Sequence, residues 1–174
     1  MIASLRLILL ALFLAMAGIA PSSAQPMFSP NVEVSLVPMH RWAAPGSTAI
    51  VAVRQDIKPG WHTYWRNPGD SGGATELTWE LPAGFSAGLI LWPLPERQPV
   101  KGLMNYGYSH QVYLPVPIDV PRTAKSGSTV PLSVTVLSMV CSEDMCVPDE
   151  RTVKFDLPVR DGVPPLAGAE GAAI

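Results

Sequence analysis

Prolines and glycines interrupt this chain so often that they exclude long helices from most of it. Of nineteen prolines and fourteen glycines, only Pro21 and Gly18 lie in the first 24 residues, and the others are spread along the rest of the sequence. In a helix interior these residue types cost about 3 and about 1 kcal/mol relative to alanine. No window of eleven or more residues after residue 24 carries a convincing helical period. The chain is therefore expected to fold as short strands joined by turns.

Alternation of apolar and polar residues marks the strongest strand candidates. Residues 130–136 place valine or leucine at every second position, and residues 153–159 repeat this pattern. Six further segments are rich in β-favouring residues: residues 32–37, 49–53, 61–65, 77–81, 89–92 and 112–116. Pro59-Gly60 and Asn67–Gly73 are turn signals between them. About eight short strands predict an all-β fold, an antiparallel β-sandwich of the immunoglobulin-like kind.

The N-terminus has the pattern of an export signal. Arg6 precedes an apolar run from Leu7 to Ala20, and Ser22-Ser23-Ala24 supplies the small residues that signal peptidase recognises before Gln25. The run is shorter than the roughly 18 to 20 residues that a membrane-spanning helix needs. The sequence therefore predicts a signal peptide at residues 1–24 and an exported product without a membrane span.

The remainder has the size of one domain. Removing 24 residues from 174 leaves 150, enough for a real hydrophobic core. We expect this domain at residues 25–160 and a flexible tail at residues 161–174, which are rich in glycine, alanine and proline. Without Arg6 the net charge of −2 becomes −3, and the basic residues are scattered singly. Nucleic-acid binding is therefore not expected, because it needs a basic stripe.

One segment has the letters of a protease signature. Gly69-Asp70-Ser71-Gly72-Gly73 resembles the surroundings of the nucleophilic serine in chymotrypsin-like proteases. That chemistry also needs a histidine oriented by a buried carboxylate. Only His40 and His62 precede Ser71, neither with a suitable acid in the expected context, and 150 residues are too few for two β-barrels. The segment is better interpreted as a tight loop.

Cys141 and Cys146, the two cysteines of the chain, lie between the two best strand candidates. Their disulfide would close so short a ring that it stabilises the fold by about 2 kcal/mol, at the low end for disulfides. This weak structural effect favours a redox function. Glu143 and Asp144 inside the ring disfavour a thiolate, which is the attacking species in disulfide exchange. The pair is thus expected to be attacked by the thiolate of a partner, or to be activated when the partner docks.

Two other interpretations of the pair stay open. It could be a purely structural bond in a non-catalytic binding module. Met139, Cys141, Met145 and Cys146 could also bind Cu(I) when the cysteines are reduced, because thiolate and thioether are soft ligands. The alternative for the methionines is that they fill gaps in the core. A zinc site is less favoured, because no histidine pair lies near the cysteines at ligand spacing.

Five segments in this order resemble one known family. They are Gly60–Gly72, Trp92–Arg97, Asn105–Tyr108, Leu114–Ile118 and Val140–Glu150. They are similar to the N-terminal periplasmic domain of the thiol:disulfide interchange proteins DsbD and, more closely, ScsB, which is named for suppression of copper sensitivity. The resemblance runs from Val32 to Val159, nearly the whole of the expected domain.

This resemblance implies an immunoglobulin-like periplasmic domain whose Cys141–Cys146 pair relays electrons to or from thioredoxin-like or other disulfide-exchange proteins. It implies a protein-disulfide reductase activity that needs partner domains and no cofactor, with Cys146 as the attacked sulfur. In DsbD an aromatic loop caps the disulfide, and the candidates here are Tyr64, Tyr106 and Tyr108. Family members usually continue into a membrane segment and a thioredoxin-like domain; with neither in this sequence, a separate membrane electron donor is expected.

Overall fold

The computed structural model describes residues 31–174, in which ten strands and one short helix are found. The strands are β1 Val32–Pro38, β2 Thr48–Ile57, β3 Thr63–Gly69, β4 Glu76–Glu80, β5 Ser86–Ala87, β6 Glu96–Val100, β7 Leu103–Tyr108, β8 Gln111–Asp119, β9 Thr129–Cys141 and β10 Cys146–Pro158, and the helix is α2 Gly168–Ala172. The predicted signal peptide lies outside the described residues. Within residues 31–174, no helix has the length and apolar character needed to cross a membrane.

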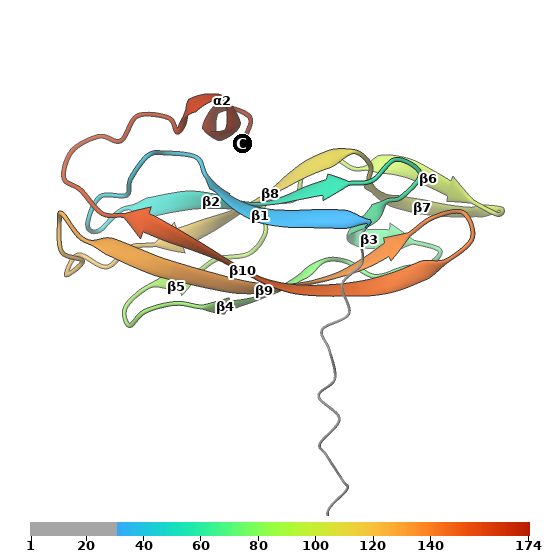
Figure 1. The fold of residues 1–174 in the computed structure, drawn as a ribbon, viewed down its shortest axis with the longest axis horizontal. Coiled ribbons are helices and arrows are strands. Elements are labelled where there is room, and N and C mark those ends of the chain that lie inside the picture. Colours follow the sequence, from blue (N-terminus) through green and yellow to red (C-terminus); the bar gives the residue numbers. More distant parts are fainter. Residues whose placement is uncertain (1–30) are drawn as a thin grey trace, which may run out of the picture.

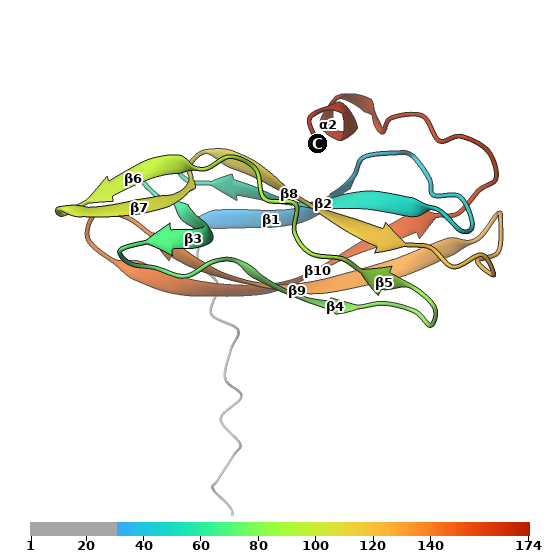
Figure 2. The same cartoon turned by 180° about the vertical axis from the view of Figure 1, so that it is seen from behind.

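The strands form two layers and a small third sheet. One layer has the order β1-β2-β8-β5 and the other β10-β9-β4, and all pairings are antiparallel. The third sheet, β3-β7-β6, lies at the end of the sandwich where β9 turns into β10 (Figures 1 and 2). The prediction of an all-β, immunoglobulin-like antiparallel sandwich is confirmed. Seven of the eight strand candidates fall on or overlap strands.

The core lies between the two layers and follows the predicted alternation. Every second residue of β8 and of most of β9 is buried. Strands β2, β8 and β9 supply many of the core's fully buried apolar side chains: Val51, Val53, Leu114, Val116, Ile118, Leu132, Val134 and Val136. Four tryptophans are only partly buried and pack against this core: Trp61, Trp65, Trp79 and Trp92. The core therefore holds the long β9–β10 hairpin against the opposite sheet.

The strand predicted at residues 89–92 is wrong, and the reason lies in β8. Residues 88–95 run along the edge of β8 without regular structure. Gly88 and Leu91 donate their backbone N–H groups to the carbonyls of Pro117 and Pro115, at 2.8 Å each. The two prolines have no N–H to donate in return. Because half of the ladder is missing, the segment follows β8 without becoming a strand.

The β6–β7 hairpin was not predicted as strands. Polar residues and Pro99 hide its alternation, and its turn is Lys101-Gly102 instead of a common Asn-Gly pair. Both turn residues have positive φ, 47° and 86°, as a tight two-residue hairpin turn requires. The turn signal at residues 67–73 was also partly wrong, since β3 continues through Gly69 with a shift of register. Both differences lie in the third sheet, which covers the cysteine end of the sandwich.

Residues 161–174 are the segment expected to be a flexible tail, and part of it forms hydrogen bonds with the residues that follow β1. Arg41 donates its N–H to the carbonyl of Pro165, and Ala167 donates to Met39, both at 3.0 Å. In α2, Glu170 forms an ion pair with Arg54. Figure 1 shows the helix lying above β1 and β2.

Candidate functional site

The two cysteines end the longest hairpin of the fold. β9 and β10 pair without interruption from Thr129 and Pro158 to Cys141 and Cys146, which are direct cross-strand partners joined by a disulfide. Their Cα atoms are 4.1 Å apart. The intervening loop is held by Ser142, whose N–H donates to the carbonyl of Met145 at 2.9 Å and whose hydroxyl accepts from the N–H of Asp144 at 3.2 Å. The hairpin thus presents a covalently closed ring at its tip.

The two halves of the disulfide differ in exposure. Cys141 is 1% exposed, whereas Cys146 lies on the surface. The burial of Cys141 follows from an isolated bridge to His62, in which each backbone N–H donates to the other residue's carbonyl, at 2.8 and 3.0 Å. An incoming group therefore reaches Cys146 more readily than Cys141.

Two side chains reach toward the pair, His62 just before β3 and Tyr64 within it. The Tyr64 hydroxyl lies 4.0 Å from Cys146 Sγ and 3.2 Å from His62 Nε2. Burial raises the pKa of Tyr64, against a smaller lowering by its hydrogen bond with Ser71, so the phenol stays protonated. Burial lowers the pKa of His62, so its imidazole is neutral at pH 7. A neutral histidine and a protonated phenol thus line up toward the exposed sulfur.

The protease-like segment supports Tyr64. Ser71 donates its N–H and its hydroxyl to Asn105 Oδ1, at 2.9 and 3.1 Å. Gly72 has a φ of +88°, and a Cβ at this position would overlap the Tyr64 ring. The loop therefore closes over the ring. Ser71 bonds to Asn105 and Tyr64, and no hydrogen bond from Ser71 to a histidine is found among residues 31–174.

The β6–β7 hairpin lies beside the cysteine loop. At its turn, Lys101 Nζ forms an ion pair with Asp144 Oδ1 at 3.2 Å. A cleft of about 510 Å³ separates the base of this hairpin from the cysteine loop, and its lining includes Trp61, Pro99 and Glu143. The cysteine ring is thus flanked by one ion pair and one open cleft.

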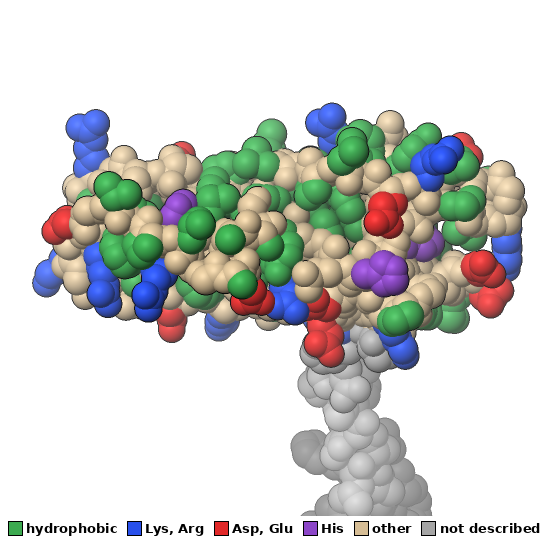
Figure 3. Space-filling model, turned by 90° about the horizontal axis from the view of Figure 1, so that it is seen from above, with side chains coloured by type: hydrophobic (Ala, Val, Ile, Leu, Met, Phe, Trp, Pro, Cys, Tyr) green, Lys and Arg blue, Asp and Glu red, His purple; other side chains and the backbone are tan. Residues whose placement is uncertain are grey.

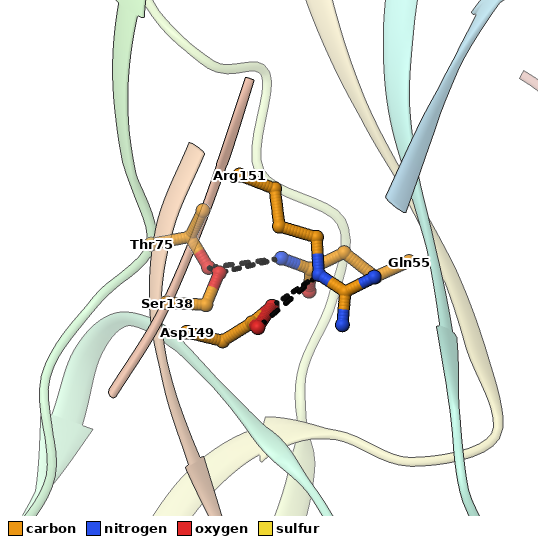
Figure 4. Close-up of polar contacts among 5 residues, drawn as sticks. All are labelled: Gln55, Thr75, Ser138, Asp149 and Arg151. Carbon is orange, nitrogen blue, oxygen red and sulfur yellow. Dashed lines mark hydrogen bonds and ion pairs between the residues drawn. The ribbon is translucent and has the colours of Figure 1, made fainter. Parts of the chain in front are cut away.

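A buried polar cluster fixes the hairpin to the opposite sheet below the disulfide. Gln55 of β2 donates to Ser138 at 2.9 Å and accepts from Thr63 at 2.8 Å, and the Thr75 and Ser138 hydroxyls are 3.2 Å apart. Asp149, the cross-strand partner of Ser138, accepts from Arg151 Nε (Figure 4). Ser138 is three residues before Cys141, and Thr63 lies between His62 and Tyr64. Satisfied buried hydrogen bonds therefore set the position of the cysteine strand relative to β3.

Sequence reasoning found part of this site. It placed Cys141 and Cys146 at the end of a hairpin, as observed. Of the three aromatic candidates, Tyr64 contacts the pair, whereas the Tyr108 hydroxyl donates to the carbonyl of Pro93 at 2.9 Å. His62 was not predicted as a member of the site, because its sequence context suggested only the protease signature. Its spacing of two from Tyr64 on a strand, which places both side chains on one face, could have indicated it.

The proposed Cu(I) ligands are only partly placed together. Cys141 and Cys146 are bonded to each other, and Met145 beside them is 56% exposed. Met139 pairs with Pro148, two positions further from the tip. In residues 31–174 no group of three or more histidine, cysteine, aspartate or glutamate side chains is arranged to hold a metal ion.

An antiparallel sandwich whose longest hairpin ends in an asymmetric, partly exposed disulfide has the architecture of a thiol–disulfide interchange domain. Residues 33–158 match the family "Thiol:disulfide interchange protein DsbD, N-terminal", and the chain belongs to this family. The resemblance inferred from the five sequence segments is thereby confirmed.

Two solved structures are similar to this chain. The N-terminal periplasmic domain of ScsB from Proteus mirabilis matches with a TM-score of 0.57 and 21% identity, over 83% of this chain and 52% of that one. This chain thus spans about half the length of that structure. The reduced N-terminal domain of DsbD from Neisseria meningitidis matches with a TM-score of 0.40 and 16% identity, over 76% of this chain and 89% of that one. A comparison with curated proteins finds no match.

Proposed function

We propose that this domain is a periplasmic electron relay, in which Cys141 and Cys146 exchange disulfides with thioredoxin-like or other thiol proteins. The observation that carries the proposal is the asymmetry of the pair, with an exposed Cys146 and a Cys141 buried under β3. Exchange needs one accessible sulfur and a second one that stays close enough to resolve the mixed disulfide. The export signal and the similarity to a periplasmic ScsB domain support the location.

In the reductive half of the cycle, a partner thiolate attacks Cys146 Sγ. The new bond joins the partner sulfur to Cys146, and the bond between the two cysteines breaks with its electron pair on Cys141 Sγ, which then takes up a proton. A second partner thiolate attacks the mixed disulfide and releases Cys146 as a thiolate. Two electrons have then entered the pair, and the partner leaves as a disulfide.

Tyr64 can stabilise the Cys146 thiolate, both when Cys146 is the leaving group and when it is the nucleophile. Its hydroxyl, 4.0 Å from Cys146 Sγ, can donate a hydrogen bond to the thiolate when the mixed disulfide opens. This donor opposes the effect of Glu143 and Asp144, which disfavour a thiolate in the same loop. In the oxidative half the sequence of steps is reversed: the Cys146 thiolate attacks a target disulfide, and Cys141 resolves it. Turnover as a protein-disulfide reductase requires an electron donor that reduces the pair again after each cycle.

The test measures the potential of the pair and the mixed disulfides that it forms. Equilibration with glutathione should give a reduction potential above about −300 mV, whereas an inert structural bond lies below that value. Cys141→Ser, which leaves the exposed Cys146 as a free thiol, should form mixed disulfides with added proteins in their disulfide form much faster than Cys146→Ser. A potential well below that value, together with equal and slow trapping by both variants, would show a structural bond in a binding module.

A Cu(I) site is a second candidate, favoured by the exposed Met145 next to Cys146. Met139, Met145 and the two reduced cysteines would supply thioether and thiolate ligands, which suit Cu(I). The reduced protein should then compete with a Cu(I) chelator at least tenfold better than a Cys141→Ser/Cys146→Ser variant. Equal competition by the two proteins would remove this candidate.

A further inference from the structure

The open cleft beside the disulfide is not used by the exchange steps above. It lies between the β2–β3 turn at Gly60 and Trp61, the end of β6 at Pro99 and Val100, and the cysteine loop at Glu143 and Asp144. Glu143 and Asp144 belong to the ring that the disulfide closes, and they precede Cys146 by three and two positions. A group bound between these side chains and Trp61 is therefore close to the disulfide. The cleft is close enough to Cys146 to receive residues that flank the attacking cysteine of a partner.

The charged groups that line the cleft are carboxylates. Its lining contains two carboxylates, of Glu143 and Asp144, and no lysine or arginine. Lys101 reaches the loop from outside and pairs with Asp144, and in the described part of the chain no ion pair involves Glu143. Figure 3 shows acidic and histidine side chains at this end of the molecule, with basic ones interspersed singly. The Glu143 carboxylate is thus available to a cation.

The other surfaces around the ring fit a protein partner. Trp61 adds an indole ring to the lining, which can pack against the stem of a cationic side chain or bind its charge. Leu103, Met104 and Met145 expose 43%, 37% and 56% of their surface near the hairpin turns. Methionines and aromatic residues with a charged rim are typical of surfaces that bind proteins.

We propose that the cleft binds a lysine or arginine side chain located next to the reactive cysteine of the partner, and that Glu143 selects it. This inference rests on the proposed exchange function and specifies the partner: a thiol protein with a cation beside its cysteine. The bound cation increases the rate at which the partner associates with the domain. It takes no part in forming or breaking the bonds between sulfur atoms. Such pairing between exposed charges is screened by salt.

The test uses two synthetic dithiol peptides that contain Cys-Gly-Pro-Cys and differ only in two flanking residues, lysines in one and glutamates in the other. The rate at which each peptide reduces the disulfide is followed by acid quenching and mass spectrometry. Glu143→Gln should lower the ratio of the lysine-peptide rate to the glutamate-peptide rate by about two- to fivefold, the size expected for one exposed ion pair. This difference should shrink as salt is raised from about 0.05 to about 0.5 M.

Glu80→Gln is the matched control, because Glu80 is an exposed residue of β4 paired with Ser133, eight positions along β9 from Cys141. It should leave the ratio unchanged. An unchanged ratio in Glu143→Gln would overturn the inference, and so would an equal decrease in Glu80→Gln, which would indicate a general effect of net charge. 2-Mercaptoethanol, which attacks as an anionic thiolate and carries no cation, should react no more slowly with Glu143→Gln than with the other two proteins. If neither peptide nor this thiol opens the disulfide, the exchange function itself is wrong, and the inference falls with it.

Discussion

Replacing Tyr64 by phenylalanine tests whether the phenol assists the reactive sulfur. The change removes one hydroxyl that lies 4.0 Å from Cys146 Sγ and 3.2 Å from His62 Nε2, and it retains the buried ring. A hydrogen bond to a charged group contributes about 1.5–3 kcal/mol. Because 4.0 Å is long even for a bond to sulfur, the lower value of about 1.5 kcal/mol applies to the Cys146 thiolate.

This energy converts to a rate through two opposing effects. A loss of about 1.4 kcal/mol reduces the fraction of Cys146 present as thiolate at neutral pH about tenfold. A more basic thiolate is intrinsically more nucleophilic, with a Brønsted coefficient of about 0.4–0.5, so about half of the loss on a logarithmic scale is recovered. The reduced Tyr64→Phe protein should therefore attack a disulfide about threefold more slowly than the wild type near pH 7.

The assay is the pH dependence of alkylation of the reduced protein by iodoacetamide, with Cys141→Ser in the background so that only Cys146 reacts. The midpoint of the curve should move to higher pH in Tyr64→Phe. Tyr108→Phe is the matched control, because Tyr108 is equally buried and its hydroxyl bonds to the carbonyl of Pro93. Superimposable curves for Tyr64→Phe and the wild type would refute a direct effect of the phenol on the sulfur.

Two further predictions concern the surroundings of this tyrosine. Gly72→Ala should lower the free energy of unfolding by about 2 kcal/mol or more, because its φ of +88° is strained for alanine and its Cβ overlaps the Tyr64 ring; Gly73→Ala, with open space around it, should be nearly neutral in the same urea titration. The second follows from the lowered pKa of His62, whose folded form binds its proton less readily than the unfolded chain does. The free energy of unfolding should therefore reach its full value above about pH 6.5 and decrease as the pH falls below it. His62→Gln should make this decrease smaller, as measured by thermal unfolding from about pH 7.5 to about pH 5. The same decrease in both proteins would contradict the assignment to His62.

Local patterns in the sequence determined the class of fold. The alternation in residues 130–136 and 153–159 could be recognised without tertiary contacts, because burial of one face of a strand imposes a period of two. It correctly predicted the hairpin that carries Cys141 and Cys146. The strand predicted at residues 89–92 failed because its pairing depends on a neighbour that lies far away in the sequence. Only the fold brings Pro115 and Pro117 beside it, where they offer carbonyls without N–H groups.

The sequence by itself determined that this chain is a β-sandwich with a cysteine ring at the tip of a hairpin, because both depend on local periodicity and short spacing. Only the tertiary structure decided which sulfur is exposed and which tyrosine contacts it. It also decided which of the two carboxylates in the cysteine loop, Glu143 or Asp144, remains without an ion pair in the described chain. These properties come from the bridge between His62, just before β3, and Cys141, and from Lys101 reaching Asp144 across 43 residues of sequence. Contacts between distant segments depend on how the sheets pack, and no local pattern encodes that packing.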